Sequence, residues 1–171
     1  IGQARGRVSE LTLSVNCFVP KPWTPFQYCS FGGLDSADGE GEAGVVQALG
    51  ALKEKIKYLR QRLRDKPNLR LKIDGPEQAL EQAVYARADR RIGPVLLDIG
   101  TGRRSFKQAL RHHGLDAWGY AVRPRPPAER FCWDRGDHGV LPGYLYTEYE
   151  RALRGLTTIP CQPTRFHRFR V

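Results

Sequence analysis

The sequence contains no methionine, no CxxC pair and no long apolar run. A transmembrane helix needs about 20 consecutive apolar residues, and neither such a run nor a signal peptide is present, so we expect a cytoplasmic protein that makes no membrane contact. Scattered cysteines fit a reducing compartment without disulfides; they are Cys17, Cys29, Cys132 and Cys161. Because even an initiator methionine is missing and a strand is predicted soon after Ile1, we expect a piece of a longer protein.

Positive charge is the main bias of the composition. With 171 residues, 40% of them hydrophobic and 27% charged, the chain is expected to form one domain that buries about 70% of its extended surface. The net charge of +10 leaves open a noncatalytic basic module that docks RNA or an acidic protein. The cations are dispersed, however, and those between Lys53 and Arg64 fit a solvated helix face. The sequence therefore favours solubility over nucleic-acid binding as the role of this charge.

Apolar and polar residues alternate in the segment 8–18, VSELTLSVNCF. The apolar set is Leu11, Leu13, Val15 and Cys17, and the polar set is Thr12, Ser14 and Asn16. This period of two predicts a strand with one apolar and one polar face. If helices of a barrel cover the apolar face, the polar row lines the lumen and Asn16 lies at its mouth.

A stiff aromatic segment, FVPKPWTPFQY at 18–28, follows this strand directly. Its three prolines hold themselves and the preceding residues in extended geometry. Rigid loops after strands are where α/β barrels place ligand-contacting groups. Two interpretations stay open: a ligand-facing loop, or a core plug formed by Phe18, Trp23 and Phe26.

The next elements follow the order of a parallel sheet. Residues 30–42 are rich in Gly, Ser and acids and predict a loop, and apolar residues then recur at steps of three and four over a helix at 43–64. The run LRLKI at 69–73 predicts a strand, and Pro76 opens another helix. Strand, helix, strand and helix in this order predict an α/β fold.

The segment VLLDIGTG at 95–102 has two competing interpretations. A strand that ends in Asp-x-Gly-x-Gly is typical of the S-adenosylmethionine site of Rossmann-type methyltransferases. Here only two glycines are present, Arg103 and Arg104 follow, and too little chain remains for the other βα units. The apolar spacing around it fits a helix as well.

Two further groups of residues contain metal-ligand types. His112 and His113 fall in the last turn of a predicted helix at 103–115, where cations favour the helix dipole, and this role is favoured over metal ligation. The block FCWDRGDHGV at 131–140 contains Cys132, Asp134, Asp137 and His138. Capping of a turn by one of the aspartates, over a packed Trp133, is favoured there too. We therefore predict no metal site in this chain.

Five blocks resemble, in order, one family. LTLSVNCFVPKPWTPFQY at 11–28 is similar to a family segment SVNPFVPKPxTPFQW, and ALEQAVYARADRRIG at 79–93 to a pattern A-ARGDRRI. ALRHHGLD, WDRGDHGV (family WDHIDHGV) and YLYTEYERALRGLTTIPC (family YL-EYERAL-G-TPPC) continue the match. The family comprises radical S-adenosylmethionine proteins of the type with a cobalamin-binding domain. The resemblance also implies that VLLDIGTG is helical.

The resemblance implies a partial TIM-like (β/α) barrel followed by a mainly helical extension. Residues 1–75 would form its closing βα units and residues 76–171 the extension. In this family a 4Fe-4S cluster held by CxxxCxxC cleaves S-adenosylmethionine reductively, with cobalamin as a possible further cofactor. That motif is absent here, so the chain alone is expected to be inactive and to partner the rest of the barrel.

The same resemblance implies a set of contacts at the barrel mouth. We expect Asn16, Lys21, Thr24 and Phe26 to face cofactor or substrate. Family members often end in Cys-x4-Cys-x2-Cys, but here Phe166 and Phe169 stand at the last two cysteine positions. A second cluster in the C-terminal segment is therefore not expected.

Overall fold

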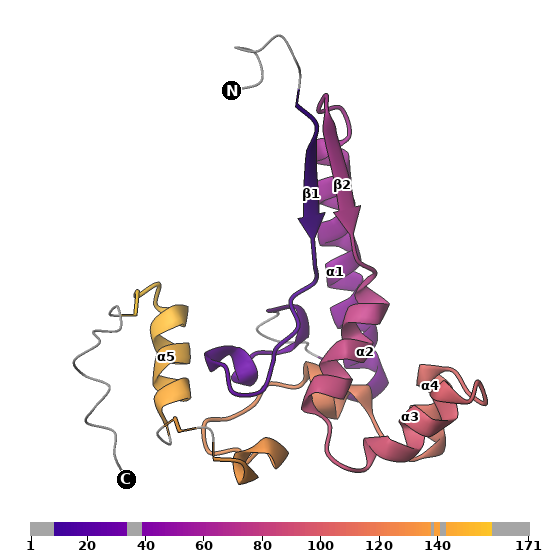
Figure 1. The fold of residues 1–171 in the computed structure, drawn as a ribbon, viewed down its shortest axis with the longest axis vertical. Coiled ribbons are helices and arrows are strands. Elements are labelled where there is room, and N and C mark those ends of the chain that lie inside the picture. Colours follow the sequence, from indigo (N-terminus) through magenta and orange to yellow (C-terminus); the bar gives the residue numbers. More distant parts are fainter. Residues whose placement is uncertain (1–8, 34–38, 138, 141–142, 159–171) are drawn as a thin grey trace.

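A parallel βαβ unit forms the start of the chain in the computed structural model, which describes residues 9–33, 39–137, 139–140 and 143–158. Strand β1 (Leu11–Val15) pairs with β2 (Leu69–Ile73), and helix α1 (Gly41–Leu63) connects them (Figure 1). The mixed α/β class is confirmed. Within the described residues the only sheet is this two-stranded one, and most of the remaining structure is helical.

The two strands pair in register, Leu11 opposite Leu69 through Val15 opposite Ile73. Paired residues lie on the same face, and the odd-numbered side chains of β2 line a depression together with Leu63 of α1. The apolar face therefore points to α1, as expected, and the polar face is turned away from it. β1 is shorter than the predicted segment 8–18, because it pairs only with the five residues of β2.

Four more α-helices follow in the described part of the chain. They are α2 (Pro76–Arg87), α3 (Ile92–Gly100), α4 (Phe106–His112) and α5 (Tyr144–Leu153). Short 3₁₀ turns form η2 (Pro25–Tyr28), η3 (Phe31–Gly33) and η5 (Cys132–Arg135), and a single π-helical turn forms η4 (Trp118–Val122). Residues 95–100 of the segment 95–102 are therefore helical, as the resemblance implied, and no strand there leads into a glycine loop.

The core lies among the helices rather than on the sheet. Its fully buried residues include Phe31, Val84, Val95 and Val122, and it draws on both sides of residue 75. Gly44 is what lets η4 approach α1: a Cβ there would lie 2.6 Å from Trp118 Cδ1. Trp118 Nε1 in turn donates to Gly39 O at 3.0 Å.

Helix α5 lies beside the proline-rich segment, far from α3 and α4 (Figure 1). Its Tyr146 and Tyr149 pack on Tyr28, with ring centroids 5.0 and 5.8 Å apart. Of the helices in the described part of the chain, none combines the length and the apolar character required to cross a bilayer.

Candidate functional site

Asn16 lies directly after the carboxyl end of β1, where the polar row predicted it. Its side chain is exposed and makes no hydrogen bond within the described residues. Asp74 takes the equivalent position after β2, and its backbone N–H donates to Val15 O at 3.4 Å. Two polar side chains thus follow the carboxyl ends of adjacent parallel strands, which is where α/β folds bind ligands. Asp74 was not singled out from the sequence, because its position depends on the strand register.

Lys21 and Thr24 share one turn of the proline-rich segment. Thr24 Oγ1 donates to Lys21 O at 2.9 Å, and the Lys21 side chain is exposed, with no ion pair in the described part of the chain. Phe26 is 41% exposed and packs edge-to-face on Phe18 at 5.8 Å and on Tyr149 of α5 at 6.3 Å. Phe18, Trp23 and Phe26 are all exposed and none belongs to the buried core, so the core-plug interpretation is wrong. Phe26 instead helps to dock α5 at the surface, and Lys21 is open to solvent.

Arg87, the last residue of α2, joins three parts of the chain. Its guanidinium donates to Cys29 O at 2.8 Å, to Gln27 O at 3.4 Å and, through Nη2, to Ala121 O. The side chain is only 2% exposed. Burial, together with the charges of Arg125 and Arg123, lowers the pKa of Arg87 to about 9.

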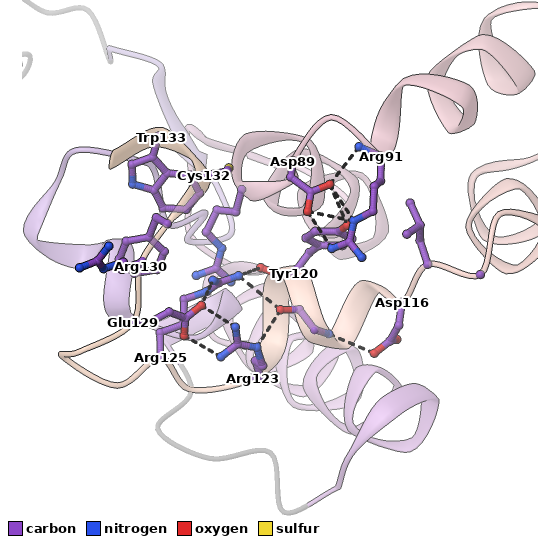
Figure 2. Close-up of a pocket in the computed structure, with 15 residues that line it drawn as sticks. Asp89, Arg91, Asp116, Tyr120, Arg123, Arg125, Glu129, Arg130, Cys132 and Trp133 are labelled. Atoms are coloured by element: carbon purple, nitrogen blue, oxygen red, sulfur yellow. Dashed lines mark hydrogen bonds and ion pairs between the residues drawn. The ribbon is translucent and has the colours of Figure 1, made fainter. Parts of the chain in front are cut away.

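A cavity of about 420 Å³ lies next to Arg87, between the end of α2, η4, the connector RPRPP and η5. We call it the arginine pocket. Figure 2 shows its charged residues arranged around Tyr120. Its lining comprises Arg87, Asp89, Arg91, Gly114, Leu115, Asp116, Gly119, Tyr120, Arg123, Arg125, Glu129, Arg130, Phe131, Cys132 and Trp133.

One carboxylate in the arginine pocket serves two guanidinium groups. Glu129 accepts from Arg123 at 2.5 and 2.7 Å and from Arg125 at 2.6 Å. Burial alone would raise the pKa of Glu129, but the Arg123 hydrogen bonds and the Arg125 charge outweigh it and lower that pKa. Arg125 is 9% exposed and also donates to Tyr120 O at 2.7 Å.

A second ion pair forms the opposite side of the pocket. Arg91 Nε and Nη2 donate to Asp89 at 3.0 and 2.7 Å, and this pairing lowers the pKa of Asp89 to about 2. The Tyr120 hydroxyl also donates to Asp89, at 3.4 Å. Asp116 is held differently, because it accepts from the backbone N–H groups of Trp118 and Gly119.

Aromatic rings and a capped turn form the third wall. Phe131 and Trp133 stack with centroids 4.6 Å apart and planes 5° from parallel. Asp134 accepts from Phe131 N at 2.7 Å, so the predicted turn capping over a packed tryptophan is confirmed. The sequence contained the signals of this pocket, in ARADRR and RPRPP, but no local pattern shows that these two segments meet.

Asp98 of α3 forms a separate cluster with the two histidines of α4. Candidate ligand atoms of Asp98, His112 and His113 lie within 4.8 Å of one another. Yet Asp98 Oδ2 already accepts from Arg104 at 2.6 Å and pairs with His113 Nε2 at 3.0 Å. These two contacts link Asp98 of α3 to Arg104 in the following turn and to His113 at the end of α4, and we call this cluster the Asp98 lock of the α3–α4 hairpin. Burial alone would raise the pKa of Asp98, but the hydrogen bonds from His113 and Arg104 lower it.

The described residues do not fit a four-iron four-sulfur cluster. Such a cluster takes several thiolate ligands, and among the described residues the only group of three potential metal ligands contains no cysteine. Cys17, Cys29 and Cys132 form no disulfide among the described residues. Cys161 and His138 lie outside the described residues.

Comparison with protein families, curated proteins and solved structures gives no match.

Proposed function

We propose that this chain provides closing βα units of the barrel of a cytoplasmic radical S-adenosylmethionine enzyme. The observation that carries the proposal is the unit β1–α1–β2. Its parallel strands and connecting helix follow the order of one segment of a (β/α) barrel. Its apolar face points to α1, and its polar face ends in Asn16 and Asp74 at the carboxyl ends of the strands. The motif that surrounds Asn16 is also the one that resembles this enzyme family.

The exposure of β1 supports the same proposal. Parallel sheets are normally covered on both faces and rarely stop at two strands. Here Leu11 is 64% and Leu13 37% exposed, and the free edge of β1 has no partner within the described residues. Neighbouring strands of a barrel would pair with this edge and enclose the polar row.

The proposal assigns the cluster to another part of the enzyme. In this enzyme class a CxxxCxxC cluster supplies the electron that cleaves S-adenosylmethionine, and this chain has no such motif. Its own residues would bind and orient. Asn16 would exchange a hydrogen bond with cofactor or substrate, Lys21 would pair with a carboxylate or phosphate, and the prolines would hold Lys21 in place.

The test begins with the coding sequence upstream of the codon for Ile1, where we expect a CxxxCxxC motif. The polypeptide that spans both parts, reconstituted with iron and sulfide, should cleave S-adenosylmethionine when reduced. Asn16→Ala should weaken cofactor or substrate binding about fivefold, as for one lost hydrogen bond, with an unchanged melting temperature. Thr12→Ala, on the same face at the other end of β1, is the control. An upstream sequence without the motif would overturn the proposal.

A basic module that docks RNA or a protein is the alternative. We place it second because Lys53 and Lys57 of α1 already pair with Glu77 and Glu54. A mobility-shift titration with unstructured RNA at increasing salt separates the two functions. Tight binding that falls steeply with salt would favour the basic module.

A further inference from the structure

We propose that the arginine pocket is a binding site for a small organic anion that carries phosphate or carboxylate groups. The proposal does not depend on the radical chemistry suggested above, because the pocket lies in the helical part of the chain, away from the strand ends. It is built from the end of α2, η4, the connector that follows η4, and η5.

The first argument is an excess of positive charge. Five arginines line the pocket against three carboxylates, Asp89, Asp116 and Glu129. Glu129 is shared by two guanidinium groups, and the Asp116 carboxylate already accepts hydrogen bonds from backbone N–H groups. At least one positive charge therefore lacks an anionic partner within the described residues.

The second argument is the way in which the buried arginines are satisfied. Arg87 has carbonyl oxygens and no carboxylate as partners, and the Nε atoms of Arg87 and Arg125 are buried without an acceptor in the described part of the chain. Burial, with a smaller contribution from neighbouring cations, lowers the pKa of Arg87 and that of Arg125. An anion in the pocket would stabilise the charged form of both groups.

The third argument is the exposed guanidinium of Arg130 at the edge of the arginine pocket. Arg130 is exposed and makes no ion pair or hydrogen bond within the described residues, although it lines the pocket. The planar guanidinium group matches the geometry of carboxylate and phosphate oxygens. Arg130 can therefore contact an incoming anion without first giving up another partner.

The size and the walls indicate the class of ligand. A volume of about 420 Å³ lies in the range of pockets that hold small organic molecules, and it is far larger than a single phosphate ion requires. Tyr120, Phe131 and Trp133 supply an aromatic wall beside the cations. The site thus suits an anion attached to an organic body, such as a nucleotide or a polycarboxylate.

The test uses three probes on the chain at constant ionic strength. Adenosine monophosphate carries phosphate, citrate carries carboxylates, and adenosine is a neutral match for the first. We expect at least one anion to bind one-to-one by isothermal titration calorimetry and to raise the melting temperature, and adenosine to bind at least tenfold more weakly than the better anion. Comparison of the two anions shows which acid group the pocket prefers.

Variants separate the pocket from general attraction to a basic protein. Arg130→Gln should reduce anion affinity about tenfold, and folding should be unaffected because Arg130 has no partner to lose. Arg103→Gln removes an exposed arginine outside the pocket and should leave affinity unchanged. The proposal is overturned if neither anion binds, if adenosine binds as well as the better anion, or if the two variants lose affinity equally.

Discussion

Arg87 shows how a single side chain fixes the relative positions of distant segments. It lies at the end of a helix that the sequence predicted, yet the carbonyl oxygens that it contacts belong to residues 34 to 60 positions away. Sequence periodicity predicts which face of a helix is buried, but it does not identify such partners. For the same reason the arginine pocket could not be predicted, whereas Asn16 at the strand end could.

Replacing Arg87 with methionine tests this role. Arg87→Met roughly keeps the side-chain volume but removes the donors to three carbonyl groups, so it should lower the free energy of unfolding by about 3 kcal/mol. Arg90→Met changes an exposed arginine of the same motif and should stay within about 0.5 kcal/mol. Urea denaturation measures both variants. Equal losses in both would show that Arg87 is not a structural link.

At the scale of elements, the sequence predicted most helices and both strands, and it was ambiguous where an apolar run is short. Helix α1 and strand β2 agree with their patterns because each repeats over a whole element. The run at 95–99 fitted both a strand and a helix. The helix is consistent with the burial of Val95 and Asp98, which lie three residues apart on one face.

Two glycines of α1 give opposite predictions for one substitution. Alanine is favoured over glycine inside a helix by about 1 kcal/mol, and Gly50 has open space around it. Gly50→Ala should therefore stabilise the chain by up to about 1 kcal/mol. Gly44→Ala should destabilise it, because the new methyl would meet Trp118 and the backbone of Gly39. Urea midpoints of the two variants should move in opposite directions; a gain in both would mean that η4 does not pack on α1.

The Asp98 lock predicts an acid-sensitive hairpin. Since folding lowers the pKa of Asp98, its ionised form stabilises the fold above the usual aspartate pKa of about 4. This contribution is lost as the pH falls through the lower pKa of the folded state.

The measurement compares Asp98→Asn with the unmodified chain. The variant should have the lower urea midpoint at pH 6, and the difference should shrink towards pH 3. Asp65→Asn, which removes an exposed carboxylate without an ion pair in the described residues, should match the unmodified chain at pH 6. A difference for Asp98→Asn that stays constant between pH 6 and pH 3 would contradict the lock.

At the scale of the whole molecule, the buried core and the sheet lie in different places. The core is formed among α1, α2, α3, α4 and η4, whereas the two strands lie at one end of the molecule, beside α1 (Figure 1). The sequence predicted a barrel segment, and the described residues show one parallel βαβ unit, whose place in a barrel is our proposal. Neighbouring strands are what would turn this unit into a barrel, and no pattern within these residues specifies them.

The cysteine distribution makes one prediction for the entire chain. After anaerobic treatment with iron and sulfide, the purified chain should show no cluster absorption band and no stoichiometric iron, since it has no CxxxCxxC motif. Under our proposal, a polypeptide that also carries a CxxxCxxC segment is the positive control. One cluster per chain in the short form would contradict the assignment of the cluster to another segment.

The free edge of β1 allows the barrel proposal to be tested without measuring enzymatic activity. Leu11 N–H donates to Asn68 O at 2.8 Å, and since amides alternate between the two edges of a strand, those of Thr12 and Ser14 point away from β2. In the chain alone these two amides should exchange with deuterium much faster than that of Leu13. In the extended polypeptide a neighbouring strand should slow their exchange at least tenfold, whereas Leu13 should change little. Fast exchange of Thr12 and Ser14 in both forms would mean that β1 is a true edge strand and would exclude a barrel closed on that side.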